Sequence, residues 1–463
     1  MTKKVVVIGG GPGGYAAALY SAHLGMSVTL IEKKDLGGTC LNVGCVPTKA
    51  FVQSSNSYNS IKKLSKYGIN IDGNVSVDFK KTAKFKSDIV KQLRNGVTYL
   101  LKAAKVKVIY GNAKIVDENT VEIISNEETV REQADYIIIS TGSRVIDIPK
   151  LESDGKVILN STQILDIQEL PESIAIIGGG VIGVEFASIM KNFGKDVTII
   201  ELSSNIIPTE DIQISETLKH SLEKRGIRIY TETEVKSIVS KTDNSVTFII
   251  KNSDGEKELT TEKMLISIGR KANLEGIGLE QVGIEFNEKY IITNEKMQTN
   301  VSNIFAVGDV TKSPQLAHVA YYEAQVAALN ISGKDTKIQY NAIPSCIFSH
   351  PEVSRVGMTE EQARKEINNV GIEVQSFSSN GKAMIELETE GFVKMIYNID
   401  NKEVLGFSII GPKATELIAE PSLAINLRLN IEELSRNINA HPSLSEMIGE
   451  TASASVGLNL HSL

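Results

Sequence analysis

The stretch KKVVVIGGGPGGYAAALYSAHLGMSVTLIEK, residues 3–33, decides the fold, because it joins an apolar strand, a GxGxxG turn, a helix and a second strand. Residues 172–202, ESIAIIGGGVIGVEFASIMKNFGKDVTIIEL, repeat this order. From first glycine to closing glutamate, both copies span 23 positions. A lone GxGxxG turn is weak evidence, since glycine-rich turns also occur for structural reasons. Two complete copies predict two dinucleotide-binding sites.

Each glycine of the turn has its own role. The first permits the tight turn, the second lets the backbone approach a pyrophosphate, and the third packs the helix on the strand. The helix N-terminus then presents N–H groups and a positive dipole to the anion. The closing carboxylates, Glu32 and Glu201, can bind ribose hydroxyls. The predicted cofactor-binding glycines are Gly9, Gly11, Gly14, Gly178, Gly180 and Gly183.

Glu201 also selects the second cofactor, because a 2'-phosphate would face its negative charge. At roughly 4 Å and an effective dielectric near 20, each pair of like charges costs up to about 4 kcal/mol. Residues 202–205, Leu-Ser-Ser-Asn, include no arginine to hold such a phosphate. The second site is therefore predicted to prefer NAD over NADP.

Length, charge and cysteine content limit the remaining classes. A chain of 463 residues predicts two to four domains. Its net charge of -7 argues against nucleic acid as a partner. No apolar run approaches the eighteen or so residues that span a bilayer, so we expect no membrane segment. Three cysteines are too few for an extracellular disulfide scaffold, and we expect a cytoplasmic protein.

Two of the cysteines, Cys40 and Cys45, lie in GGTCLNVGCVPTK, residues 37–49. A metal site needs about four ligands, and no histidine or further cysteine lies nearby. In a regular helix these Cα atoms are roughly 8.6 Å apart, whereas a disulfide needs about 4.4 to 6.8 Å. A bond therefore requires a helix distorted at Gly44 or Pro47. Because a short, strained bond stabilises little and is easily reduced, a redox-active pair is favoured.

A flavin at the first site could exchange two electrons with this pair, and a nicotinamide at the second site could exchange a hydride. Apolar return strands at 136–142 and 264–269 follow the two repeats, and a long helix is expected at 78–104. We therefore expect an α/β fold with two Rossmann-like domains, the NAD domain inserted in the FAD domain, and a C-terminal α+β dimerisation domain. The expected boundaries are 1–149 and 271–341 for the FAD domain, 150–270 for the NAD domain and 342–463 for the interface domain.

Thiol exchange also needs an acid–base group, and none of the six histidines lies near the cysteine pair. His441 precedes Glu446 by five positions, about one helical turn, so the carboxylate can hold the imidazole tautomer. A capping role near a helix start is the alternative. Lys49, on the helical face of Cys45, and Glu185 are either solvated helix residues or a pair beside the cofactors.

Two further residues lie in the second half of the chain. A strand at 304–307 delivers Asp309 to its carboxyl end, where it can bond a ligand hydroxyl, although Gly-Asp is also a common turn. Cys346 is predicted to be a small buried hydrophobic residue. Strands at 394–399 and 404–410, followed by helices, indicate the third domain.

Taken together, these segments resemble the flavoprotein disulfide reductases. The matching segments occur in the family's order along nearly the entire chain: GGGPGG, GGTCLNVGCVPTK, STGSR, GGGVIGVE, SIGR, FAVGD, LAH, FSHPEVSRVGMTE and HPSLSE. The cysteine segment and His-Pro-x-x-x-x-Glu are specific in combination. Within the family, the chain is similar to the branch that oxidises protein-bound dihydrolipoamide; Val181 stands where glutathione-type reductases have a tyrosine.

The resemblance implies a homodimer whose active site is shared between subunits. Cys40 would exchange with the dithiol substrate and Cys45 would contact the flavin. His441 and Glu446 would act on the cysteines of the partner subunit. The lipoyl group would come from another protein, either the acyltransferase of a 2-oxoacid dehydrogenase complex or the carrier protein of glycine cleavage.

The resemblance also assigns cofactor contacts. It implies that Lys49 pairs with Glu185 near the flavin and that Asp309 binds the ribityl chain. Further candidates from the matching segments are Thr141, Gly142, Gly269 and Ala317. Two alternatives remain: an NADH-dependent reductase of another disulfide, and a non-catalytic scaffold subunit, which would need no reducible cysteine pair.

Overall fold

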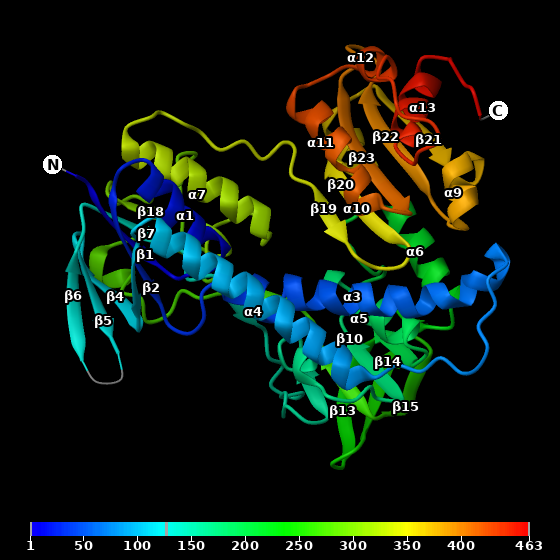
Figure 1. Cartoon of the computed structure of the whole chain (residues 1–463), viewed down its shortest axis with the longest axis horizontal. Helices are drawn as coiled ribbons and strands as arrows, with labels where there is room; N and C mark the ends of the chain where they lie inside the picture. Colours follow the sequence, from blue (N-terminus) through cyan, green and yellow to red (C-terminus); the bar gives the residue numbers. More distant parts are fainter. Residues whose placement is uncertain (1, 126–127, 462–463) are drawn as a thin grey trace. The chain divides into compact units, whose positions relative to one another are not determined.

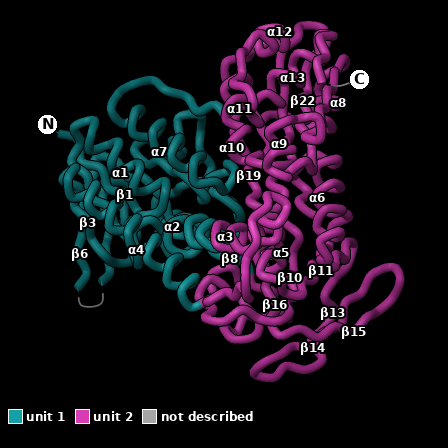
Figure 2. The backbone as a smooth tube through the Cα atoms, turned by 45° about the vertical axis from the view of Figure 1, so that its right-hand side comes forward, with its two compact units in different colours: residues 1–51, 80–146, 269–339 teal, residues 52–79, 147–268, 340–463 magenta. Residues whose placement is uncertain are grey.

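The computed structural model describes residues 2–125 and 128–461. The chain forms two compact units, each assembled from three segments (Figure 2). Unit 1 comprises residues 1–51, 80–146 and 269–339, and unit 2 comprises residues 52–79, 147–268 and 340–463. No helix in the described part of the chain is long and apolar enough to cross a membrane.

Unit 1 is built around a parallel sheet with strand order β18-β7-β1-β2-β3 (Figure 1). Its strands are β1 (Lys4–Ile8), β2 (Ser27–Glu32), β3 (Lys107–Tyr110), β7 (Tyr136–Ile139) and β18 (Ile304–Ala306). Val5 and Val7 belong to one hydrophobic cluster, and Val6 and Ile8 belong to another. Both faces of β1 are therefore covered, which explains its continuous apolar sequence.

Helices cover one face of this sheet and a small antiparallel sheet covers the other. The covering elements are α1 (Pro12–His23), α4 (Phe79–Ala103), α7 (Ala317–Ser332), β4 (Asn112–Asp117), β5 (Thr120–Ile124) and β6 (Thr129–Gln133). Ala17, Leu101 and Ala327 bring the three helices into one core, whereas Ile115 and Val121 lie in the other. The long helix predicted at 78–104 is confirmed by α4.

Unit 2 contains a second parallel sheet, with strand order β12-β11-β10-β16-β9. Its strands are β9 (Ile158–Asn160), β10 (Ser173–Ile177), β11 (Asp196–Ile200), β12 (Arg228–Tyr230) and β16 (Lys263–Ile266). Helices α5 (Val181–Asn192) and α6 (Ile212–Lys224) follow β10 and β11. Because β10 lies between β11 and β16 as β1 lies between β2 and β7, the repeat predicted from the sequence is confirmed.

Two smaller sheets and the helices after β2 complete the nucleotide-binding parts. An antiparallel sheet in unit 2 consists of β13 (Glu234–Lys241), β14 (Val246–Asn252) and β15 (Gly255–Thr261). In unit 1, β8 (Ser143–Val145) pairs with β17 (Arg270–Ala272). Helices α2 (Gly38–Val43) and α3 (Cys45–Ser60) follow β2.

The C-terminal part of unit 2 is an antiparallel sheet with order β19-β20-β23-β22-β21. Its strands are β19 (Ser345–Ile347), β20 (Glu352–Gly357), β21 (Val370–Ser376), β22 (Phe392–Asn398) and β23 (Val404–Gly411). The helices are α8 (Glu360–Glu366), α9 (Gly381–Glu386), α10 (Ala414–Leu417), α11 (Ala419–Asn426), α12 (Ile431–Ser435) and α13 (Glu446–Ser455). The predicted α/β fold with a C-terminal α+β part is confirmed, and the predicted domain boundaries stay a prediction.

Candidate active site

The helix that carries the cysteine pair is interrupted at Gly44, one of the two predicted positions. Gly44 has φ -147° and ψ -111°, outside the helical region. A Cβ atom at this position would lie 2.9 Å from the Thr39 carbonyl oxygen, so a side chain is excluded. Cys40 therefore lies in α2, and Cys45 is the first residue of α3.

The two cysteines are thiols in this structure, and they interact. Cys40 is half-buried, whereas Cys45 is exposed. Their mutual hydrogen bond, reinforced by burial, raises the pKa of Cys40 far above that of an ordinary thiol. Lys49 acts in the opposite direction on this pKa, as a positive charge in the first turns of α3 does. The break at Gly44 thus brings together the two sulfurs that the sequence predicted as a redox pair.

Two tyrosines lie near this pair, and no local pattern in the sequence pointed to them. The hydroxyls of Tyr15, on α1, and Tyr321, on α7, are 2.6 Å apart. Burial raises the pKa of both phenols, and a thiolate at Cys40 would act in the same direction. The phenols therefore stay protonated, and each can donate a hydrogen bond.

A polar chain connects the cysteine helix to Asp309. Arg270 donates from Nε to Ser143 Oγ at 2.8 Å and from Nη2 to Thr39 Oγ1 at 3.3 Å. Ser143 Oγ donates in turn to the Asp309 carboxylate. Burial lowers the pKa of Arg270, and the negative charge of Asp309 opposes this effect. Arg270 and Ser143 belong to the SIGR and STGSR segments, so these segments were the available signal for both residues.

The remaining predicted flavin-site residues fall in the loops around this chain. Thr141 Oγ1 donates to the Asn273 carbonyl at 2.8 Å, and Asn273 Nδ2 donates back to the Thr141 carbonyl at 2.9 Å. Gly142 and Gly269 have φ of +69° and +124°, a conformation that favours glycine. Ala317 is the first residue of α7. The Thr141–Asn273 contacts join the loop backbones at the carboxyl ends of β7 and β17.

The first glycine turn has little room for side chains. Gly9 has φ of +100°, and a Cβ on it would lie 2.2 Å from the Ser140 carbonyl oxygen. A Cβ on Gly14 would lie 1.7 Å from the Gly9 oxygen, so this glycine is required for helix–strand packing. Glu32 Oε2 accepts from the Gly10 N–H at 2.6 Å, which orients the carboxylate toward the turn.

The second turn repeats this geometry in unit 2. A Cβ on Gly178 or Gly183 would lie 2.5 or 2.0 Å from a carbonyl oxygen. Glu201 Oε2 accepts from the Gly179 N–H at 2.6 Å. A Cβ on Gly180 would meet nothing within 4 Å, and no described side chain caps α5. This open space at a helix N-terminus fits a dinucleotide pyrophosphate.

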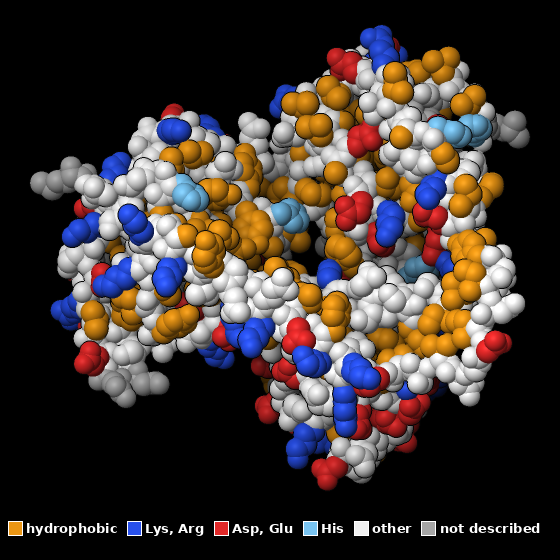
Figure 3. Space-filling model, viewed as in Figure 1, with side chains coloured by type: hydrophobic (Ala, Val, Ile, Leu, Met, Phe, Trp, Pro, Cys, Tyr) orange, Lys and Arg blue, Asp and Glu red, His pale blue; other side chains and the backbone are white. Residues whose placement is uncertain are grey.

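His441 and Glu446 form a close pair in unit 2. His441 Nδ1 lies 2.7 Å from Glu446 Oε1, and the Ser443 N–H donates to Glu446 Oε2 at 2.7 Å. Burial acts to raise the pKa of Glu446, but the Ser443 N–H and His441 lower it overall. A second imidazole, His461, lies 2.9 Å from Glu450, one turn further along α13. Figure 3 shows histidine side chains at the surface in the region of α13.

The position of the helix start corrects one expectation. Glu446 is the first residue of α13, so His441 lies in the segment before the helix rather than one turn back along it. The imidazole is therefore held from outside the helix and is 79% exposed. Its second ring nitrogen, Nε2, is thus directed away from the carboxylate that fixes Nδ1.

Glu185 and Cys346 also differ from one expectation each. Glu185 is buried, at 3% exposure, so the solvated-helix alternative is wrong. Its Oε1 accepts from the Phe348 N–H at 3.0 Å. Lys49 belongs to unit 1 and Glu185 to unit 2, and their pairing stays a prediction. Cys346 is half-buried against the C-terminal core rather than fully buried.

Comparison with known proteins gives consistent relatives over the whole chain. A dihydrolipoyl dehydrogenase of Bacillus subtilis is 40% identical, over 99% of both chains. A dihydrolipoyl dehydrogenase of Geobacillus stearothermophilus is 38% identical, over 99% of this chain and 97% of its own.

Solved structures give the same result. LpdA from Mycobacterium tuberculosis has a TM-score of 0.91 at 26% identity, over 98% of this chain and 99% of its own. The HOCl-induced flavoprotein disulfide reductase RclA from Escherichia coli has a TM-score of 0.86 at 29% identity, over 97% of this chain and 99% of its own.

Two family models match consecutive parts of the sequence. Residues 3–324 match "Pyridine nucleotide-disulphide oxidoreductase", and residues 343–452 match the dimerisation domain of the same family. The glycine turns, the closing glutamates and the cysteine pair lie within the first match, and the His441–Glu446 pair lies within the second. The chain therefore belongs to the pyridine nucleotide-disulphide oxidoreductase family, and its cofactors are FAD and NAD.

Proposed function

We propose that this enzyme oxidises dihydrolipoyl groups carried by other proteins and reduces NAD, as the flavoprotein component of 2-oxoacid dehydrogenase or glycine-cleavage complexes. The observation that carries the proposal is the His441–Glu446 contact of 2.7 Å. Oxidising a dithiol requires a base for its thiol protons, and an imidazole fixed at Nδ1 can accept a proton at Nε2. The full-length similarity to relatives named dihydrolipoyl dehydrogenase supports the same substrate class.

The net reaction converts one dithiol and NAD⁺ into one disulfide, NADH and one proton. The two substrate S–H bonds break as the S–S bond forms, and the electron pair first reduces the Cys40–Cys45 disulfide. When bound, FAD relays this pair between the cysteines and NAD. The proposed base His441 takes a thiol proton, so that the substrate thiolate attacks Cys40 and Cys45 leaves.

The remaining residues bind and orient. Glu446 holds the His441 tautomer, and its two oxygens are fixed by the imidazole and the Ser443 N–H. Arg270, through Ser143, holds Asp309 where the proposed contact with the FAD ribityl chain would form. Lys49 is proposed to pair with Glu185 beside the flavin.

The proposed assembly is a homodimer in which His441 acts on the cysteines of the second copy. The dimerisation-domain match at 343–452 supports this arrangement. The proposed substrate carrier is a lipoyl-bearing acyltransferase or the glycine-cleavage carrier protein. The proposed location is the cytoplasm, in keeping with a chain that holds only three cysteines.

A steady-state assay with dihydrolipoamide and NAD tests the proposal. Wild-type enzyme should turn over, Cys45→Ser should not, and Cys346→Ser should match wild type, because Cys346 lies outside the pair. Equal rates for wild type and Cys45→Ser would overturn it.

The likeness to the disulfide reductase RclA favours a second candidate, an NADH-dependent reductase of another disulfide. This candidate predicts that NADH with glutathione disulfide or a protein disulfide gives a higher kcat/KM than NAD with dihydrolipoamide. The reverse order is expected if the enzyme is the lipoyl oxidase that we propose.

A further inference from the structure

The turn between β19 and β20 rests on helix α5 at two points, both within unit 2. The Phe348 N–H donates to Glu185 Oε1 at 3.0 Å, and the His350 N–H donates to Ser188 Oγ at 2.9 Å. Glu185 and Ser188 are three positions apart and thus neighbours on one helical face. Two N–H groups of the β19–β20 turn therefore bind neighbouring side chains on one face of α5. The Phe348 contact orients the buried Glu185 carboxylate.

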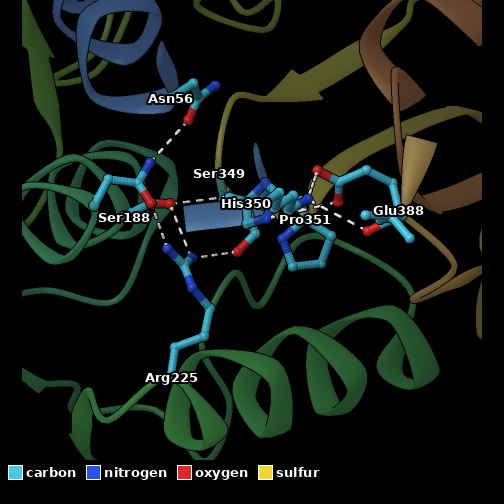
Figure 4. A network of polar contacts seen from close by, with 10 residues as sticks. Asn56, Ser188, Arg225, Ser349, His350, Pro351 and Glu388 are labelled. Carbon is cyan, nitrogen blue, oxygen red and sulfur yellow. Dashed lines mark hydrogen bonds and ion pairs between the residues drawn. The ribbon is translucent and has the colours of Figure 1, made fainter. Parts of the chain in front are cut away.

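Arg225, directly after α6, bonds both this turn and α5 (Figure 4). Its Nη1 donates to the His350 carbonyl oxygen at 2.6 Å, and its Nη2 donates to Asn192 Oδ1 at 2.5 Å. Asn192 in turn donates to Asn56 Oδ1 at 2.8 Å. His350 is thus fixed at both its N–H and its carbonyl, and one guanidinium joins the turn to the last residue of α5.

The position of Arg225 is costly, which indicates a specific role. Burial lowers the pKa of Arg225, and Glu390 and Glu388 oppose this effect from a distance. Its hydrogen bonds within the described residues go to a carbonyl and to neutral side chains, which stabilise a buried cation less than a carboxylate does. The guanidinium fork instead satisfies two acceptors of fixed direction, for which Arg is better suited than Lys.

The outer face of the turn is held as well. The imidazole of His350 lies 3.7 Å from Glu388, which also bonds Lys63 (Figure 4). Ser349 Oγ donates to the Pro351 carbonyl at 2.6 Å. These contacts leave the Phe348 N–H little freedom to move relative to α5.

We propose that Arg225 is a positioning residue: it fixes the β19–β20 turn on α5 and thereby sets where the Phe348 N–H holds the Glu185 carboxylate. This inference rests on the proposed role of Glu185 beside the cofactors. Loss of Arg225 should disturb hydride exchange between NADH and the flavin, because the proposed place of the Glu185 carboxylate is beside the flavin. The thiol steps at the cysteine pair should continue.

Arg225→Gln in the FAD-loaded enzyme tests the inference with two measurements. Peptide-level hydrogen exchange should rise about tenfold over residues 345–352 and stay unchanged over β1. Rapid mixing with NADH should show flavin reduction slowed at least about tenfold. A positioned group that is displaced by about 1 Å can lower a reaction rate about 10²-fold. Flavin reduction by dihydrolipoamide should stay within about twofold of wild type.

Matched variants separate positioning from general destabilisation. Arg228→Gln removes an exposed arginine three positions further on, in β12 and paired with Asp196, and should change neither measurement. Arg225→Lys can reach only one of the two acceptors and should restore part of the rate. Ser188→Ala removes the acceptor for the His350 N–H and should act in the same direction as Arg225→Gln.

Each contrary outcome has a definite meaning. Unchanged exchange over 345–352 in Arg225→Gln would show that Arg225 does not fix the turn and would overturn the inference. Raised exchange with an unchanged NADH rate, or an equal slowing of both half-reactions, would also overturn it. Absence of dihydrolipoamide oxidation in wild type would refute the proposed substrate instead. Hydrogen exchange and flavin reduction by NADH are both measured without that substrate.

Discussion

Gly180→Ala should separate NAD binding from folding. Gly180 has φ -72° and ψ -174°, a conformation open to alanine, and its Cβ would meet nothing within 4 Å. The protein itself therefore tolerates the methyl group. The space that the methyl would fill is where we propose that the pyrophosphate approaches the N-terminus of α5.

The expected loss follows from the hydrogen bonds that the methyl group prevents. A hydrogen bond to a charged group contributes about 1.5–3 kcal/mol. Losing one such bond to the pyrophosphate should raise the Kd for NADH roughly 10- to 100-fold, since each 1.4 kcal/mol is about tenfold. FAD content should not change, because its glycine turn lies in unit 1.

The assay is fluorescence titration of purified enzyme with NADH, together with thermal unfolding and FAD content. Gly96→Ala is the matched control, because its Cβ also meets open space but belongs to α4 and to neither glycine turn. Gly183→Ala should instead prevent folding of the NAD site, since its Cβ would lie 2.0 Å from the Gly178 oxygen. An unchanged Kd for NADH in folded Gly180→Ala would refute the assignment of this space to the pyrophosphate.

Three further predictions concern the site residues. Replacing His441 by Gln should slow dihydrolipoamide oxidation by about 10² to 10⁴-fold with FAD still bound; a wild-type rate in stopped-flow mixing would remove His441 from the mechanism. Wild-type enzyme should show a higher kcat/KM with NADH than with NADPH, because Glu201 is fixed by the Gly179 N–H and would oppose a 2'-phosphate; the reverse preference would contradict this. The lowered pKa of Glu446 stabilises the fold above its ordinary value of 4.5, and this stabilisation disappears as pH falls through the lower folded value. The melting temperatures of wild type and Glu446→Gln should therefore differ at neutral pH and converge in acid, and a constant difference would exclude this linkage.

The glycine turns and the break at Gly44 could be predicted because their causes are local. A fixed spacing of glycines determines the turn, and a five-residue separation of cysteines cannot close within a regular helix. Tyr321, Arg270 and Arg225 could not be found in this way. Their partners, Tyr15, Thr39 and His350, are more than a hundred positions away, and no periodicity links them.

The other two differences concern Glu185 and His441. The residue type of Glu185 suggests a solvated helix face, but the β19–β20 turn covers that face and supplies an N–H donor. The spacing of His441 and Glu446 suggests one helix, but α13 begins only at Glu446. For Glu185, tertiary packing, which local sequence does not encode, decides the surroundings of the side chain.

The break at Gly44 also gives the proposed disulfide a chemical polarity. Cys45 begins the sixteen-residue helix α3, whose N-terminal N–H groups favour negative charge on a leaving sulfur. In thiol exchange, the sulfur whose negative charge is better stabilised is the better leaving group. An incoming thiolate that attacks Cys40 would expel Cys45, and the reverse attack would be slower. One glycine between two helices would thus favour one direction of attack on an otherwise symmetric S–S bond.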